Sequence, residues 1–265
     1  MGGLRWSRTR RAASLGLVLF IAVLWVPFSP ADAQSRDAAR GGIKVSPALV
    51  TIASALVPGA GQAIMRQKRS IAYFLLEAAG VGFYIKETRD GSRQRDRYRD
   101  ISQTVARAPF FPSGQQGDWD YYERMEKYAS SGAFDAVAGG AVDPEADAST
   151  YNGSVWLLAR QTYWRDPEAP PPSSTEEYQA AVRFYTERAV TPEFRWSWLG
   201  APDAFQKYRA AIAASNSSFK SAETTAGLVI ANHFLSAVDA YVSVNARVRR
   251  NSDGSIWLTF ARPLP

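Results

Sequence analysis

The chain has 265 residues, of which 46% are hydrophobic and 12% aromatic, and it carries a formal net charge of +6 at pH 7. It contains no cysteine and one histidine, which excludes disulfides, thiol catalysis and the usual zinc sites. It also contains no Gly-x-Ser-x-Gly motif and no phosphate-binding glycine loop, so we expect no catalytic residues, no cofactor and no metal ion.

Residues 1–33 have the three parts of a secretory signal peptide. Four arginines precede an apolar run at residues 15–26, and Ala31-Asp32-Ala33 forms a small-x-small cleavage site. Because a membrane-spanning helix needs about 20 apolar residues, this shorter run favours cleavage after Ala33 over an uncleaved anchor. We therefore expect an exported protein of the cell envelope, periplasmic and associated with the membrane.

Much of the positive charge lies in this leader. The chain has 31 Lys+Arg and 25 Asp+Glu; four of the arginines and one aspartate belong to residues 1–33, which leaves 27 basic and 24 acidic residues. A nearly neutral mature protein lacks the basic surface that phosphate neutralisation requires. We expect no nucleic-acid partner.

After a polar, flexible lead-in at residues 34–46, two apolar segments predict a helical hairpin at residues 47–86. The first segment ends at a break formed by Pro58, Gly59 and Gly61, residue types that interrupt helices. A short basic turn then leads to the second apolar segment at residues 71–85, so a hairpin is the simplest structure.

Residues 87–221 form a charged and aromatic region, in which helical periodicity and capping residues predict further helices. Asp118 is the expected N-cap of one of them, and Ser174-Thr175-Glu176-Glu177 has the capping chemistry to begin another. The predicted helices cover residues 86–107, 118–131, 154–164, 174–190 and 203–214.

A long apolar helix is predicted at residues 222–248, followed by a C-terminal tail at 249–265 with a short strand at 256–260. Strand-like alternation is otherwise scarce, so the expected fold class is mainly α. We expect one helical domain at 47–265: a bundle of the apolar hairpin and the late helix, with an aromatic helical insertion between them.

Three segments together resemble an uncharacterised family of exported bacterial envelope proteins. They are the Pro-Gly-x-Gly-Gln break at residues 56–62, the apolar stretch at 73–84, and residues 232–241, which end in Asp239-Ala240-Tyr241. The resemblance implies membrane association and brings no activity with it.

Polar residues form one stripe on the late helix: Asn232, Ser236, Asp239 and Ser243 lie at offsets of 0, 4, 7 and 11. An acidic group among apolar neighbours must be paired or neutralised, so the stripe should face a partner.

Two polar residues of the hairpin are the expected partners, because Glu77 lies in the second apolar segment and Gln62 follows the break. Gln62, Glu77, Asn232 and Asp239 are therefore predicted to form one cluster. It either binds an ion or small ligand, or locks the late helix against the hairpin by hydrogen bonds alone.

His233 is the sole histidine, and it precedes Asp239 by six residues, about 240° around a helix. The two side chains cannot pair within that helix, so a catalytic pair is not predicted.

Aromatic residues concentrate at positions 151–198, together with several arginines. They either build the core of a domain without disulfides, stack on sugars, or lie at a membrane interface. The expected function is that of a membrane-associated envelope protein of structural or interaction type, whose partners are the membrane surface or other envelope proteins. The alternative is a periplasmic ligand- or glycan-binding module that uses the aromatic region.

Overall fold

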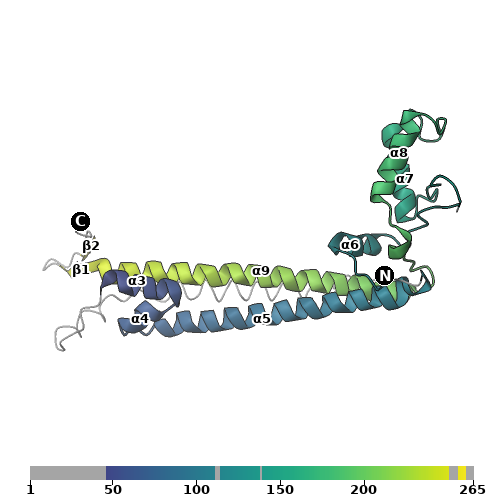
Figure 1. The fold of residues 1–265 in the computed structure, drawn as a ribbon. Helices are drawn as coiled ribbons and strands as arrows, with labels where there is room; N and C mark the ends of the chain where they lie inside the picture. The colour runs from purple at the N-terminus through teal and green to yellow at the C-terminus, as the bar shows by residue number, and fades with distance from the viewer. Residues whose placement is uncertain (1–45, 111–113, 138, 251–255, 261–265) are drawn as a thin grey trace, which may run out of the picture. The chain divides into compact units, whose positions relative to one another are not determined.

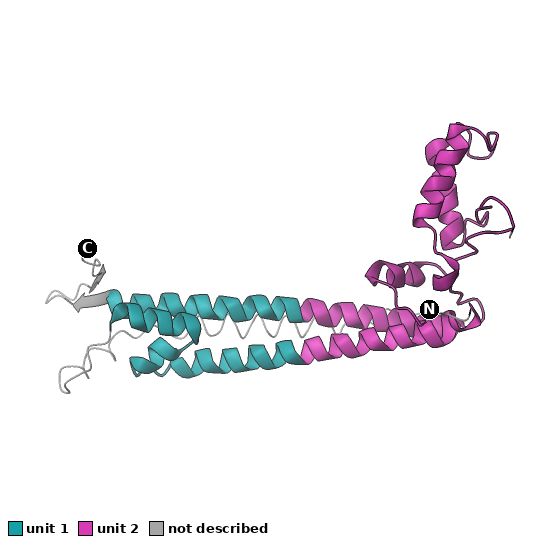
Figure 2. Cartoon of the chain, viewed as in Figure 1, with its two compact units in different colours: residues 1–85, 222–265 teal, residues 86–221 magenta. Residues whose placement is uncertain are grey.

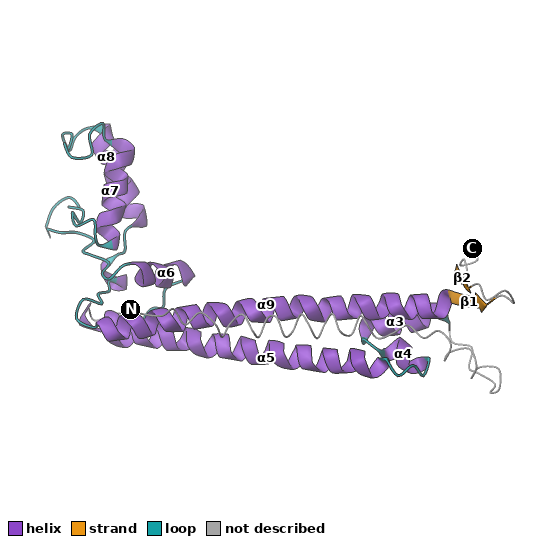
Figure 3. Cartoon of the chain, turned by 180° about the vertical axis from the view of Figure 1, so that it is seen from behind, coloured by secondary structure: helices purple, strands orange, loops and turns teal. Residues whose placement is uncertain are grey.

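The structure, a computed structural model, describes residues 46–110, 114–137, 139–250 and 256–260, and the side chains as far as residue 245. The predicted signal peptide at 1–33 lies outside the described residues, as does nearly all of the lead-in. The described chain contains seven α-helices and one small β-hairpin, which confirms the mainly α class (Figures 1 and 3).

The chain divides into two compact units (Figure 2). Unit 1 comprises residues 1–85 and 222–265, and unit 2 comprises residues 86–221. The single domain of the sequence analysis thus consists of two compact parts. Unit 2 covers residues 86–221, and the charged and aromatic region was expected at residues 87–221.

Unit 1 is built from the predicted hairpin and the late helix. Helix α3 spans Pro47–Leu56 and begins with a proline at its first position, where the missing N–H needs no partner. Helix α4, Ala60–Ile64, starts after Gly59, whose φ of 92° suits glycine. The first part of α5, Ser70–Ile101, and the last part of α9, Pro202–Asn245, complete the helices of this unit.

Helices α5 and α9 are longer than predicted. Helix α5 runs from Ser70 to Ile101, joining the apolar segment and the charged helix that were expected to be separate elements. Helix α9 runs from Pro202 to Asn245 and joins the helices expected at 203–214 and 222–248. Neither junction contains proline, and the serines at 215–221 are tolerated within a helix, so nothing interrupts either one.

The late helix also ends earlier than predicted, because residues 246–248 belong to a strand. Strand β1, Ala246–Arg250, pairs antiparallel with β2, Ile256–Phe260. The register places Ala246 opposite Phe260 and Arg250 opposite Ile256. The short strand expected at 256–260 is therefore present, and it pairs with a strand whose first three residues, 246–248, were predicted to be helical.

Unit 2 contains three helices between its parts of α5 and α9. They are α6, Trp119–Lys127; α7, Tyr151–Tyr163; and α8, Glu176–Arg188. Each begins at a residue whose side chain caps the helix. Asp118 caps α6 as predicted, and Thr175, within the predicted capping segment at 174–177, caps α8. A π-helical turn, Ser102–Ala106, follows α5, and short 3-10 turns occur at Ala108–Phe110 and Pro192–Phe194.

The aromatic residues of unit 2 form its core. One cluster packs Trp196, Trp198 and Tyr208 with Tyr98 and Tyr122 from α5 and α6. A second cluster, between α7 and α8, includes Trp156, Trp164 and Tyr185. Most of these rings meet edge to face, the arrangement that their quadrupoles favour.

Unit 1 has the opposite distribution of apolar and polar side chains. Its buried hydrophobic residues are only Val50, Ala222 and Ala240 among the described residues. Sixteen large hydrophobic residues of the described chain are exposed in unit 1, and five in unit 2. Those of unit 1 are Leu49, Ile52, Leu56, Val57, Ile64, Ile71, Phe74, Leu75, Val81, Phe83, Tyr84, Ile85, Ile230, Phe234, Val238 and Tyr241.

Candidate functional site

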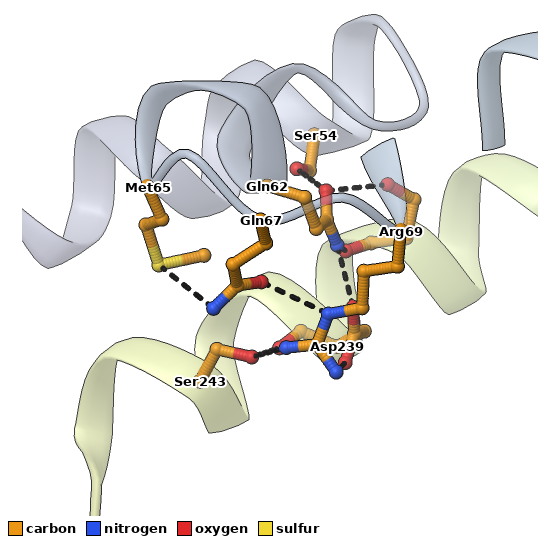
Figure 4. A network of polar contacts seen from close by, with 8 residues as sticks. Ser54, Gln62, Met65, Gln67, Arg69, Asp239 and Ser243 are labelled. Carbon is orange, nitrogen blue, oxygen red and sulfur yellow. Dashed lines mark hydrogen bonds and ion pairs between the residues drawn. The ribbon is translucent and has the colours of Figure 1, made fainter. Parts of the chain in front are cut away.

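Gln62 is the centre of a buried hydrogen-bond network in unit 1 (Figure 4). Its Oε1 accepts from the hydroxyls of Ser54 on α3, at 2.9 Å, and Ser236 on α9, at 3.3 Å. Its Nε2 donates to the carbonyl of Ser236, at 2.9 Å, and to Oδ2 of Asp239, at 2.8 Å. Both acceptor positions and both donor hydrogens of this amide are therefore used.

The break before α4 brings two glycines into the same network. The backbone N–H of Gly59 donates to the Ser236 hydroxyl at 2.7 Å, and that of Gly61 donates to the Ser54 hydroxyl at 2.8 Å. A Cβ on Gly61 would lie 2.3 Å from the carbonyl oxygen of Val50, so α3 and α4 can approach this closely only at glycine. Pro58, Gly59 and Gly61 thus position the backbone donors of the network.

Asp239 joins the network to the turn before α5. Its Oδ1 forms an ion pair with Arg69 at 3.0 Å, and the guanidinium also donates to the hydroxyl of Ser243 (Figure 4). Arg69 Nε donates to Oε1 of Gln67 at 2.9 Å, which fixes the guanidinium from its other side. The carboxylate is thereby neutralised within the protein. We call the residues Ser54, Gln62, Arg69, Ser236, Asp239 and Ser243 the Gln62 network.

Glu77 belongs to a second polar group, which lies between α5 and α9. Its Oε2 accepts from Nδ2 of Asn232 at 3.1 Å, and its Oε1 lies 3.1 Å from Nε2 of His233. Asn232 also donates to the backbone carbonyl of Tyr73, at 3.3 Å. We call Glu77, Asn232 and His233 the Glu77 group.

Tyr73 links the Glu77 group to the Gln62 network. Its carbonyl accepts from Asn232, and its phenol lies within the field of the Asp239 carboxylate. Burial raises the pKa of Tyr73 to about 12, and the negative charge of Asp239 adds to the effect. This phenol therefore stays protonated at neutral pH.

His233 connects three helices. Nδ1 lies 2.8 Å from the carbonyl oxygen of Ala55 on α3, and Nε2 faces Glu77 on α5. Both neighbours are acceptors, so the imidazolium, which has two N–H donors, fits better than neutral imidazole. The Ala55 carbonyl, followed by Glu77, raises the pKa of His233, while partial burial opposes the shift.

The structure places all four sequence-predicted cluster residues in these two groups. Gln62 contacts Asp239 directly, and Glu77 contacts Asn232 directly. Ser54, Arg69 and the role of His233 were not predicted from the sequence. Arg69 was assigned to a basic turn because three cations occur together there, and the sequence does not reveal which of them faces Asp239.

Saturated hydrogen bonding leaves the Gln62 network with few groups for a ligand. The Gln62 amide has no unused donor or acceptor, and the carboxylate of Asp239 is occupied by Arg69 and Gln62. The described residues contain no group of three or more His, Asp or Glu side chains that could hold a metal ion. What this arrangement can do is hold α3, α4, α5 and α9 together within unit 1.

Unit 2 contains a surface groove of about 550 Å³ between α6, α7 and α8. Tyr128, Tyr151 and Phe184 line it together with Arg124 and Arg188. The Arg124 guanidinium lies over the Tyr151 ring at 5.3 Å from its centroid, and that of Arg188 lies over Phe184 at 4.0 Å. These ring faces already have cation–π partners, which leaves less aromatic surface for stacking on a sugar.

One described helix is long and apolar enough to cross a membrane. It is α9, in which an 18-residue window has a mean hydropathy of 1.3 and is 17% buried. Helix α3 is apolar but shorter.

No protein-family model, curated protein or solved structure matches the chain.

Proposed function

We propose that the protein is an exported, membrane-associated envelope protein of structural or interaction type, in which unit 1 contacts lipid. The observation that carries this proposal is the exposure of apolar side chains on several sides of α5. Val81, Phe83, Tyr84 and Ile85 are all exposed, and near neighbours in a helix point in directions 100° apart. A helix that is apolar all round needs an apolar surrounding.

The interior of unit 1 also suits an apolar medium. Polar groups in lipid must find their partners within the protein, because no water is available there. Glu77, Asp239 and Gln62 all have such partners. In the described residues, the buried side-chain nitrogens without a hydrogen-bond partner all belong to unit 2.

Helix lengths favour partial insertion over a helical pair that crosses the membrane. The apolar part of α5, residues 71–85, is about 22 Å long at 1.5 Å per residue, whereas the hydrocarbon core is about 30 Å thick. Residues 222–245 of α9 extend about 36 Å by the same rule. We propose that the hairpin enters or lies against the membrane, with the late helix packed on it.

Unit 2 supplies the part that faces water and other envelope components. Its aromatic residues are buried in two clusters, which supports a structural core more than a sugar-binding surface. A ligand- or glycan-binding module is the second candidate, and the groove beside Tyr151 is the observation that favours it. The resemblance to exported envelope proteins supports the first candidate.

The proposal is tested by membrane fractionation of two matched variants. Leu75 in unit 1 is 65% exposed and Leu199 in unit 2 is 77% exposed, so Leu75→Asp and Leu199→Asp each alter a leucine at the surface. A charged residue in lipid costs about 3 kcal/mol, so Leu75→Asp should move the protein from membranes to the carbonate-soluble fraction. Leu199→Asp should fractionate like the parent.

Release of the parent protein by carbonate would contradict insertion of the apolar side chains of unit 1 into lipid. An equal effect of both variants would also contradict it, because the apolar surface would then matter only for general solubility.

A further inference from the structure

We infer that the turn between α4 and α5 binds anionic phospholipid headgroups through Arg66 and Lys68. This inference rests on the proposed membrane association and names the lipid class that unit 1 prefers. Both cations are exposed. Among the described residues, neither forms an ion pair with a carboxylate, unlike their neighbour Arg69.

Apolar side chains flank the two cations in the chain. Ile64, at the end of α4, is 43% exposed, and Ile71, in the first turn of α5, is 61% exposed. Cations next to exposed aliphatic side chains match the boundary between lipid headgroups and acyl chains, where charge and apolar contact are both satisfied.

The exposed charge at this end of unit 1 is positive. Asp239 and Glu77 are neutralised by partners inside the unit, as described above. Glu223 is exposed, but it precedes Asp239 by sixteen residues, about 24 Å along α9. An anionic surface is therefore the complementary partner.

The turn is also fixed in shape before any lipid arrives. Arg66 has a φ of 56°, and its N–H donates to the carbonyl of Ala63 at 2.9 Å. The N–H of Gln67 donates to the carbonyl of Gln62 at 2.8 Å, and Arg69 anchors the end of the turn on Asp239. A turn held at both ends loses little conformational freedom on binding, which favours affinity.

Vesicle binding by the full mature chain tests the inference. The probes are vesicles of phosphatidylcholine alone and vesicles that also contain phosphatidylglycerol. The parent protein should bind the anionic vesicles about tenfold more tightly at low salt, and the preference should shrink as salt rises.

The test variant is Arg66→Asn with Lys68→Gln, because asparagine tolerates a positive φ at position 66. The control is Lys207→Gln with Arg209→Gln, an exposed pair in unit 2 with the same spacing. The test variant should lose most of the anionic preference and keep its binding to neutral vesicles, while the control should behave like the parent.

The outcomes separate this inference from the proposed function. Equal binding of the parent to both vesicle types would overturn the headgroup inference and leave membrane association standing. Binding to neither would overturn both, and would indicate that another protein covers the apolar surface. Equal losses in test and control variants would mean that overall charge, and not this turn, sets the preference. If the test variant fails to fold, a salt-independent affinity of the parent would still overturn the inference, because a cationic contact with headgroups is weakened by salt.

Discussion

Units 1 and 2 bury opposite kinds of side chain. Unit 2 buries Trp196, Trp198 and Tyr208, as proteins in water do. Unit 1 buries Ser54, Gln62 and Ser236 and exposes isoleucine, leucine and phenylalanine side chains. One chain thus contains a unit held by apolar contacts and a unit held by hydrogen bonds. Apolar contacts are strong in water, whereas hydrogen bonds are strong where water cannot compete for the donors and acceptors.

The largest effect that separates the two units is expected from Trp196→Ala. This indole is fully buried in the aromatic core, and its N–H donates to the carbonyl of Tyr128 at 3.1 Å. Loss of the ring should lower the free energy of unfolding of unit 2 by about 3 to 5 kcal/mol. Hydrogen exchange should report the loss in residues 119–200, with residues 47–64 unchanged.

Trp119→Ala is the control, because Trp119 is 42% exposed and its loss should change the stability of unit 2 far less. A matching loss of protection in both units would show that they unfold together, and would break the comparison.

Replacing either of two glycines of unit 1 by alanine should change the stability of this unit by a smaller amount, and the two changes should have opposite signs. Gly61→Ala places a Cβ against the backbone of α3 and should destabilise unit 1 by about 1 to 3 kcal/mol. Gly82→Ala meets nothing within 4 Å and lies in the interior of α5, so it should stabilise by about 0.5 to 1 kcal/mol. The measurement is thermal unfolding in detergent; equal shifts for both variants would contradict the close packing of α3 and α4.

The smallest effect is a pH dependence that belongs to unit 1. The pKa of His233 is raised above its ordinary value of 6.5 in the folded chain, so its bonds to Ala55 and Glu77 stabilise unit 1 fully below that value. The stabilisation should be lost as pH rises through the raised pKa. It should amount to less than about 1 kcal/mol, because the pair is partly exposed.

The measurement is the stability of unit 1 between pH 5 and about 9, compared with His233→Gln, which should remove the slope. A stability that increases across this range in the parent but not in the variant would contradict the bonds assigned to His233.

Local signals in the sequence predicted the parts of the fold that depend on local chemistry. Asp118 and Thr175 could be recognised as caps, and Pro58 with Gly59 as a helix break, because each acts on backbone within a few residues. The polar stripe on the late helix was visible for a similar reason. Helical spacing alone places Asn232 and Asp239 on one face.

Choices among equivalent residues could not be predicted. Arg66, Lys68 and Arg69 are interchangeable by composition, and the path of the turn alone decides that Arg69 meets Asp239. The helix boundaries expected at residues 85–86 and at residues 215–221 were wrong for a related reason. A change from apolar to charged composition alters what surrounds a helix, but it does not break the backbone hydrogen bonds that continue it.

The Gln62 network has a consequence for the order in which the chain folds. Gln62 bonds to Ser236 and Asp239, which follow it by 174 and 177 residues. All of unit 2 lies between them, as one continuous stretch that can collapse on its own. Contacts at such separation form late, because a long loop must close first. Until the whole of the intervening unit is present, Gln62 can bond to Ser54 but has no partner on α9 for its Nε2, and unit 1 therefore closes last.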